Sequence, residues 1–191
     1  MAGSLAYFRA MARNNAWANR RLNSACAALG PGEFEAVRTG FFPSLRQTLN
    51  HILAVDRYYL DGLVEGGRGG ELFDATDYRD ATSLASAQAQ HDAALVAFCE
   101  GLTETDLERR VAYDRGADGV WNERIDLVLL HLFQHQVHHR GQAHAMLSGT
   151  SVRPPQLDEF FIEYDRDPDV EPGPLGPSSA GSQTAAPGRN R

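Results

Sequence analysis

The sequence contains no lysine, and its 18 basic side chains are all arginines. Enzymes that form a Schiff base need a lysine amine, and P-loop proteins need a lysine against the nucleotide phosphates. Both classes are therefore excluded. Acidic residues outnumber the arginines, which leaves a net charge of −7. Because nucleic-acid affinity comes largely from basic side chains that meet phosphates, we expect no nucleic-acid partner.

Cysteine is also scarce, with Cys26 and Cys99 far apart and in no CxxC pair. Both fall on expected apolar helix faces, so we interpret them as small buried side chains in a reducing compartment. Long hydrophobic runs are missing, and residues 1–17 do not have the pattern of a signal peptide. We therefore expect a cytoplasmic protein that does not associate with membranes.

Bulky apolar residues become rare near the C-terminus. From about Asp165 onward the chain is rich in proline, glycine, serine and alanine. Such a segment cannot bury enough apolar surface to offset the entropy lost on ordering it. The sequence therefore predicts one domain over residues 1–165, long enough for a hydrophobic core, and a disordered tail over residues 166–191.

Hydrophobic periodicity predicts four long helices in this domain. They cover residues 4–29, 43–64, 83–100 and 123–148. The last of these is apolar nearly all round, so it should be central. Residues 108–122 have the features of two short strands around a polar turn. The glycines at 62, 66, 67, 69 and 70 end the second helix and open a long flexible loop. We predict an all-α four-helix bundle with a short β-hairpin inserted between the third and fourth helices.

Five of the seven histidines fall within the predicted fourth helix. Positions four apart lie on one face of a helix, so His135 and His139 point the same way. Two imidazoles at this spacing can chelate one metal ion, and the apolar residues around them favour the neutral, ligating form. The glutamate of the HExxH protease motif is missing. An HxxxH pair on a buried helix is also compatible with ordinary hydrogen bonding, and the spacing alone leaves both interpretations open.

His51 is the best candidate for a third ligand. It lies inside the predicted second helix, on the same face as Val55 and Tyr58. His91 lies among polar residues of the third helix, so we interpret it as a surface residue.

Three further side chains are candidates to contact a ligand or to support the site. Tyr58 could orient a substrate, and Gln142 could hydrogen-bond a ligand or a metal-binding ring. His131 lies near the edge of the His135 stripe. For Tyr58 a packing role is the alternative, and for Gln142 a structural one.

Three segments share motifs with one known family of helical bundles. They are Asn15–Leu22, Thr48–Tyr58 and His131–Gln142, the last with the pattern HxxxHRGQ. In this order they resemble the DinB-like (damage-inducible, DinB/YfiT-type) metal-binding family, and they span nearly the whole predicted domain. The resemblance implies a four-helix bundle, often a homodimer, that holds one nickel, zinc or related ion. The positions that match the ligands of the family are His51, His135 and His139.

The resemblance also implies a chemistry. Relatives include transferases and isomerases that use low-molecular-weight bacterial thiols. Three protein ligands leave an open position for a small molecule, and an ion there activates a thiol or a water molecule. We therefore expect a metal-dependent enzyme, a thiol transferase or a hydrolase, whose catalytic residues the sequence does not identify. The alternative is a non-catalytic bundle, stapled by its metal, that acts in protein interaction or stress response.

Overall fold

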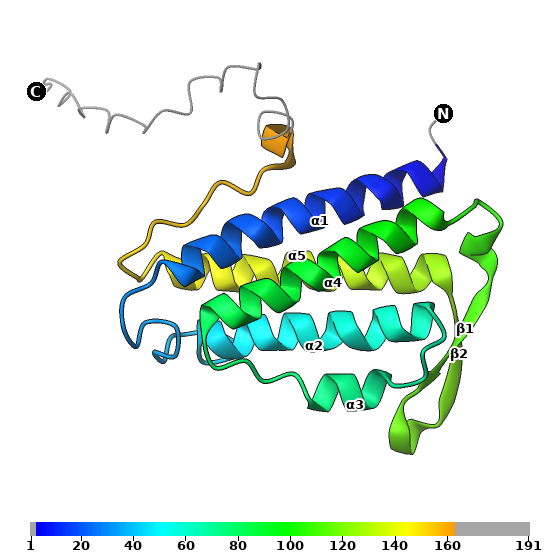
Figure 1. Cartoon of the computed structure of the whole chain (residues 1–191), viewed down its shortest axis with the longest axis horizontal. Coiled ribbons are helices and arrows are strands. Elements are labelled where there is room, and N and C mark those ends of the chain that lie inside the picture. The colour runs from blue at the N-terminus through cyan, green and yellow to red at the C-terminus, as the bar shows by residue number, and fades with distance from the viewer. Residues whose placement is uncertain (1–2, 163–191) are drawn as a thin grey trace, which may run out of the picture. The chain divides into compact units, whose positions relative to one another are not determined.

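Four long helices lie side by side in the computed structural model, which describes residues 3–162 (Figure 1). They are α1 (Ser4–Ala27), α2 (Leu45–Leu63), α4 (Ala81–Gly101) and α5 (Ile125–Leu147). A hairpin of β1 (Arg110–Asp114) and β2 (Val120–Arg124) joins α4 to α5. The predicted all-α bundle with a hairpin before its last long helix is therefore confirmed.

The chain divides into two compact units, Met1–Glu159 and Phe160–Arg191. The first contains every long helix and both strands. Short 3-10 turns occur at Asp106–Glu108, Gly116–Asp118 and Glu159–Ile162. The predicted disordered tail, residues 166–191, lies outside the described residues. Among residues 3–162, no helix combines the length and the hydrophobicity needed to cross a bilayer.

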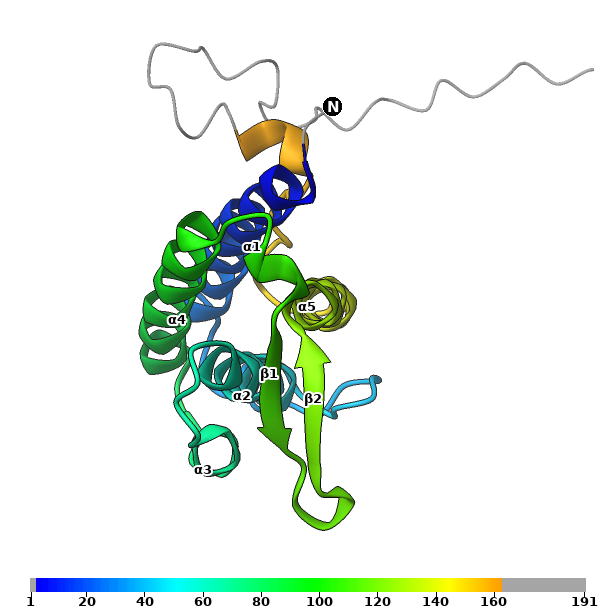
Figure 2. The same ribbon diagram turned by 90° about the vertical axis from the view of Figure 1, so that its right-hand side faces the viewer.

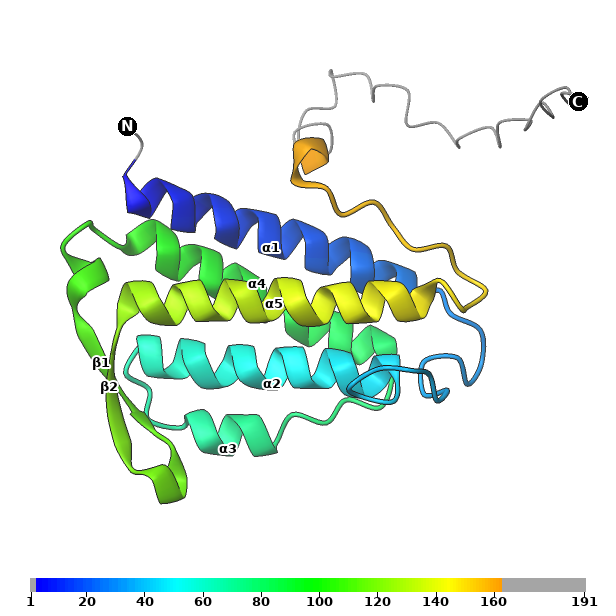
Figure 3. The ribbon, with the colours of Figure 1, turned by 180° about the vertical axis from the view of Figure 1, so that it is seen from behind.

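Each long helix packs mainly against one antiparallel neighbour, α1 against α4 and α2 against α5. Seen end-on, the four helices surround a common interior, and the hairpin crosses one end of the bundle (Figure 2). The segment between α2 and α4 contains the short helix α3 (Gly69–Asp74) and returns along the outside of α2 (Figure 3). Because α2 packs against α5, the two helices that carry the candidate ligands face each other along their length.

The structure differs from the local predictions at two places. The long loop expected after the second helix contains a short helix, α3, which begins at Gly69. Gly69 lies against the ring of Tyr58, where an added Cβ would come within 3.0 Å, so this glycine permits close packing. The third long helix, predicted from about Ser83, begins two residues earlier at Ala81, because Asp80 caps it and accepts a hydrogen bond from the Ser83 N–H at 2.8 Å.

The hairpin is anchored to the bundle by its inward side chains. Val111 and Tyr113 of β1 are buried, and the Tyr113 hydroxyl donates a hydrogen bond to the carbonyl oxygen of Tyr59 at 2.8 Å. The strands pair from Arg110 opposite Arg124 to Asp114 opposite Val120. This places the hairpin beside the C-terminal turns of α2.

The interior has apolar ends and a polar middle. One apolar cluster, toward the hairpin, includes Phe8 and Leu132, and the other, toward the opposite end, includes Leu22 and Leu147. Between them every long helix contributes buried polar side chains near its centre. The candidate metal ligands lie at the same level of the bundle as these polar residues.

Candidate metal centre

The three predicted ligands converge. Nitrogen atoms of His51, His135 and His139 all lie within 4.8 Å of one another. The Nε2 atoms of His51 and His135 are 3.0 Å apart, and the ring centroids of His135 and His139 are 4.4 Å apart. His139 is buried, and the other two rings are half-buried. Because α2 packs against α5, His51 on one turn of α2 meets His135 and His139 on two successive turns of α5.

The spacing of these nitrogens fits a shared ion. Imidazole nitrogens bind zinc at about 2.0–2.1 Å, so two of them around one tetrahedral ion lie about 3.3 Å apart. The Nε2 atoms of His51 and His135, at 3.0 Å, are close to that separation. The buried Nδ1 of His135 has no hydrogen-bond partner among the described residues. Hydrogen bonds within the cluster therefore leave this one buried nitrogen unsatisfied.

Burial keeps these rings neutral. It lowers the pKa of His51 to about 4 and that of His135 to about 3, with a smaller contribution from the neighbouring imidazoles. Burial also lowers the pKa of His139. Near neutral pH each ring thus has a lone pair available for a metal ion, and protons compete weakly for it.

Gln142 orients one of the rings. Its Oε1 lies 2.8 Å from Nδ1 of His139, and since an amide oxygen only accepts, Nδ1 must carry the proton. This leaves Nε2 of His139 free to bind an ion. The amide nitrogen of Gln142 donates to Nε2 of His138 at 3.1 Å. Of the three supporting candidates, Gln142 therefore has the most direct contact with a predicted ligand.

His131 and Tyr58 lie farther from the cluster. The exposed ring of His131 is centred 6.0 Å from that of His135, one turn away on α5. Tyr58 follows His51 by seven residues, which places it about 10 Å along α2. The structure thus does not bring Tyr58 to the three imidazoles.

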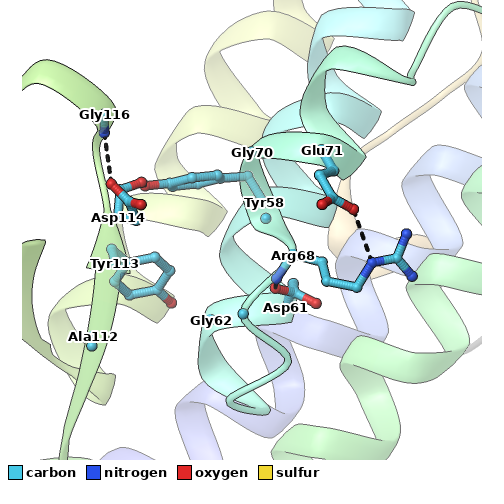
Figure 4. A pocket seen from close by; sticks show the side chains of 12 residues that line it. Tyr58, Asp61, Gly62, Arg68, Gly70, Glu71, Ala112, Tyr113, Asp114 and Gly116 are labelled. Carbon is cyan, nitrogen blue, oxygen red and sulfur yellow. Dashed lines mark hydrogen bonds and ion pairs between the residues drawn. The ribbon is translucent and has the colours of Figure 1, made fainter.

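Tyr58 instead borders a separate pocket. The pocket has a volume of about 350 Å³ and lies between the end of α2, the start of α3 and the hairpin. Figure 4 shows Tyr58 and Tyr113 on one side and Asp61, Arg68 and Glu71 on the other. The Tyr58 hydroxyl donates to the carbonyl oxygen of Asp114 at 2.9 Å. Its position therefore indicates a role in holding the hairpin.

Two aromatic neighbours of the cluster were not predicted. The ring of Phe42 is centred 4.5 Å from that of His51 and 5.7 Å from that of His139. The ring of Phe73, on α3, is centred 6.5 Å from that of His51. Adjacent aromatic residues after Gly40 were the available signal for Phe42, whereas nothing in the sequence placed α3 beside the site.

The predicted surface position of His91 was wrong. The residue is only 8% exposed. The prediction relied on its polar neighbours, and two of them, Gln88 and Asp92, are themselves buried at the centre of the bundle. Polar residues around a histidine therefore did not mark an exposed face here. Burial lowers the pKa of His91 to about 4.

Comparisons with known proteins agree with the observed fold. The family model described as the DinB family matches residues 1–170. Among solved structures, the crystal structure of the DinB-like protein YjoA from Bacillus subtilis matches with a TM-score of 0.56 at 17% identity. The match covers 78% of this chain and 97% of that one, and at this identity it shows a shared fold. No protein with a curated description matches the chain significantly. On the extent of the family match, the chain belongs to the DinB family.

Proposed function

We propose that the protein binds one divalent metal ion, nickel or zinc, on His51, His135 and His139. The observation that carries the proposal is the convergence of three imidazoles whose nitrogens lie within 4.8 Å of one another. Imidazole is a common ligand of both ions. The low pKa values of His51 and His135 support binding near neutral pH.

We further propose that the bound ion serves catalysis. Three protein ligands leave at least one position for a small molecule, and an ion there lowers the pKa of a thiol or a water molecule. We favour a transferase in which the sulfur of a low-molecular-weight thiol bonds to an electrophilic carbon. The thiol proton passes to solvent, and the leaving group departs with its bonding electrons. Phe42 and Phe73 would border the reacting molecules with apolar surface.

The two cysteines of the chain support an external nucleophile. Cys26 and Cys99 are free and buried, and burial raises the pKa of both thiols to about 12. Such thiols stay protonated and react slowly. Two unpaired cysteines also favour a reducing compartment, and we propose the cytoplasm.

Thiol binding gives a direct test. Cysteine, N-acetylcysteine or glutathione, added without oxygen to the cobalt-substituted protein, is expected to change the visible spectrum, because a thiolate replaces a weaker ligand. Serine serves as the matched control for cysteine, since it differs only in the hydroxyl. An unchanged spectrum with every thiol at saturating concentration would reject the thiol transferase.

The position of the ligands also favours a second function. His51 belongs to α2 and the other two ligands to α5, so an ion would staple the two helices and stabilise the folded chain by mass action. A stapled bundle could act through protein interaction or in a stress response. Chelation separates the two proposals. It abolishes turnover if the ion is catalytic, whereas it only lowers the melting temperature if the ion is a staple.

We also propose a homodimer. α1 and α5 share an apolar surface with a cavity of about 310 Å³. Tyr7 is 57% exposed there and Val137 53% exposed, and a second copy placed on a two-fold axis would cover both.

A charged side chain introduced into this apolar surface tests the proposed dimer. Val137→Glu is expected to convert dimers to monomers in light scattering after gel filtration, because a buried unpaired carboxylate is costly. Val64→Glu is the control, since Val64 is similarly exposed, at 58%, but lies outside the apolar surface. A monomeric unaltered protein at high concentration would contradict the proposal.

A further inference from the structure

The polar middle of the bundle is one hydrogen-bonded layer. Its members come from all four long helices, and none is more than 6% exposed. The polar layer consists of Asn15, Asn19, Asp56, Gln88, Asp92, Gln136 and Arg140. Buried polar groups cost stability unless they are paired, and apolar residues of similar volume often serve a core as well or better. The presence of seven such residues at one level therefore calls for a specific role.

One half of the polar layer links α5 to α1 and α4. The Arg140 guanidinium donates to the side-chain oxygens of Asn15 at 2.6 Å and Asn19 at 3.0 Å. The amide of Asn19 in turn donates to both carboxylate oxygens of Asp92, at 3.1 and 3.2 Å. A rotation of α5 would break this chain of bonds at its first member.

The other half links α4 to α2 and returns to α5. The amide nitrogen of Gln88 donates to Asp92 at 3.0 Å and to Asp56 at 2.9 Å. Gln136 of α5 donates to the same oxygen of Asp56. Gln136 also accepts from Arg140 at 3.4 Å, which completes a circuit through the four helices. The polar layer thus holds α2 and α5, the two helices that carry the candidate ligands.

Two members of the polar layer directly follow the candidate ligands on α5. Gln136 comes after His135, and Arg140 comes after His139. His135 and His139 are four residues apart, and so are Gln136 and Arg140. The ligands and the polar-layer residues of α5 therefore form two parallel stripes about 100° apart around the helix. The orientation of one stripe therefore determines the orientation of the other.

Apolar burial alone specifies this orientation poorly. α5 is apolar nearly all round, and Leu127 and Val137 each remain 53% exposed. A helix with this pattern could bury another face at similar gain. Yet side-chain atoms lie about 5–6 Å from the helix axis, so a rotation of about 20° moves them by about 2 Å. Metal–ligand distances tolerate only about 0.2 Å.

We propose that the polar layer sets the rotation of α5, so that Gln136 and Arg140 are positioning residues of the metal centre. They act through His135 and His139 and would not touch the ion. The inference rests on the proposed metal binding. It assigns a role in metal affinity to residues on α1 and α4 that lie outside the histidine cluster.

Two glutamines that flank His135 provide a matched test. Gln136→Met removes the bonds to Asp56 and Arg140 at nearly constant volume, and Gln134→Met changes an exposed residue outside the polar layer. Affinity for Ni²⁺ and Zn²⁺ is measured by competition titration, at a temperature where circular dichroism shows each apo-protein folded. We expect Gln136→Met to lose at least about tenfold in affinity and Gln134→Met less than about twofold. The spectrum of the cobalt-substituted protein should change in the first variant alone.

A second pair on α1 covers the case in which Gln136→Met does not fold. Asn19→Ala removes a partner of Arg140 from a helix without candidate ligands, and Asn14→Ala is the control outside the polar layer. Weaker metal binding by Asn19→Ala supports the proposal. Variants that lose stability but keep the affinity and cobalt spectrum of the unaltered protein would overturn it. If the unaltered chain binds neither ion, the proposed metal binding itself fails, which is a distinct result.

Discussion

Replacing His135 with alanine is expected to abolish stoichiometric metal binding. His135 is one of the three converging rings, and its Nε2 atom lies 3.0 Å from that of His51. Structural zinc sites gain about 10–16 kcal/mol of apparent binding free energy, or about 3 kcal/mol for each of four ligands. Loss of one ligand should therefore raise the dissociation constant by at least about a hundredfold. Elemental analysis of protein purified without added metal measures the metal content, and competition titration measures the dissociation constant.

The control is a histidine of the same helix outside the cluster. His144 contacts the carbonyl oxygen of Pro155 at 2.9 Å and is not among the three converging rings. His144→Ala should keep the metal content of the unaltered protein. Circular dichroism checks that both variants are folded. A His135→Ala protein with unchanged metal content would refute the assignment of the ligands.

Replacing Arg140 with methionine is expected to cause the largest loss of stability. Arg140 is 6% exposed, and its guanidinium lies beside Asn15 and Asn19, which connect it to Asp92. Methionine fills similar volume but leaves the asparagine oxygens unpaired and the Asp92 charge without its buried cation. Removal of one partner from a buried ionic network typically costs about 3–5 kcal/mol. Urea unfolding of the apo-protein measures the change in the free energy of unfolding.

The loss in free energy of unfolding caused by Arg140→Met should depend on pH. Burial raises the pKa of Asp92 to about 6, above the 3.8 of an ordinary aspartate. Between these values the folded state holds a proton that the unfolded state has released, so this carboxyl contributes less to stability as pH rises through the window. Without the cation, the Asp92 pKa should rise further. The deficit relative to the unaltered protein is therefore expected to be larger near pH 8 than near pH 5.

An exposed ion pair is the matched control for Arg140. Arg68 has a side chain that is 67% exposed and contacts Glu71 at 3.1 Å. Arg68→Met should change the free energy of unfolding by less than about 1 kcal/mol, with little pH dependence, because solvent screens exposed pairs. Equal losses in the two variants would contradict the view that the polar layer depends on its buried cation.

The α5 half of the candidate site could be predicted because helical geometry is local. The spacing of His135 and His139 places both rings on one face of any helix that contains them. His51 was different, since 84 residues separate it from His135. Its position within a helix made it a candidate, and the resemblance to a known family made it the ligand that matches. Only the packing of α2 against α5 brings the rings together.

The polar layer could not be read from the same patterns. Polar residues on a helix normally mark its solvent face, so Gln88 and Asp92 made their neighbour His91 look exposed. Their burial depends on partners from other helices, such as Asn19 and Gln136. Pattern analysis along one helix contains no information about such partners. Phe73 of α3 near the site was missed for the same reason.

The sequence by itself determined the four long helices, the hairpin, the spacing of the α5 ligands and the absence of lysine chemistry. Each of these depends on side chains within a few turns of one another or on composition alone. The tertiary structure alone decided that His51 meets His135, that Tyr58 lies away from them, and that seven polar residues share one buried layer. The physical reason is that these contacts depend on how each helix is rotated and shifted against its neighbours. Hydrophobic periodicity leaves that choice open for a helix such as α5, which is apolar nearly all round.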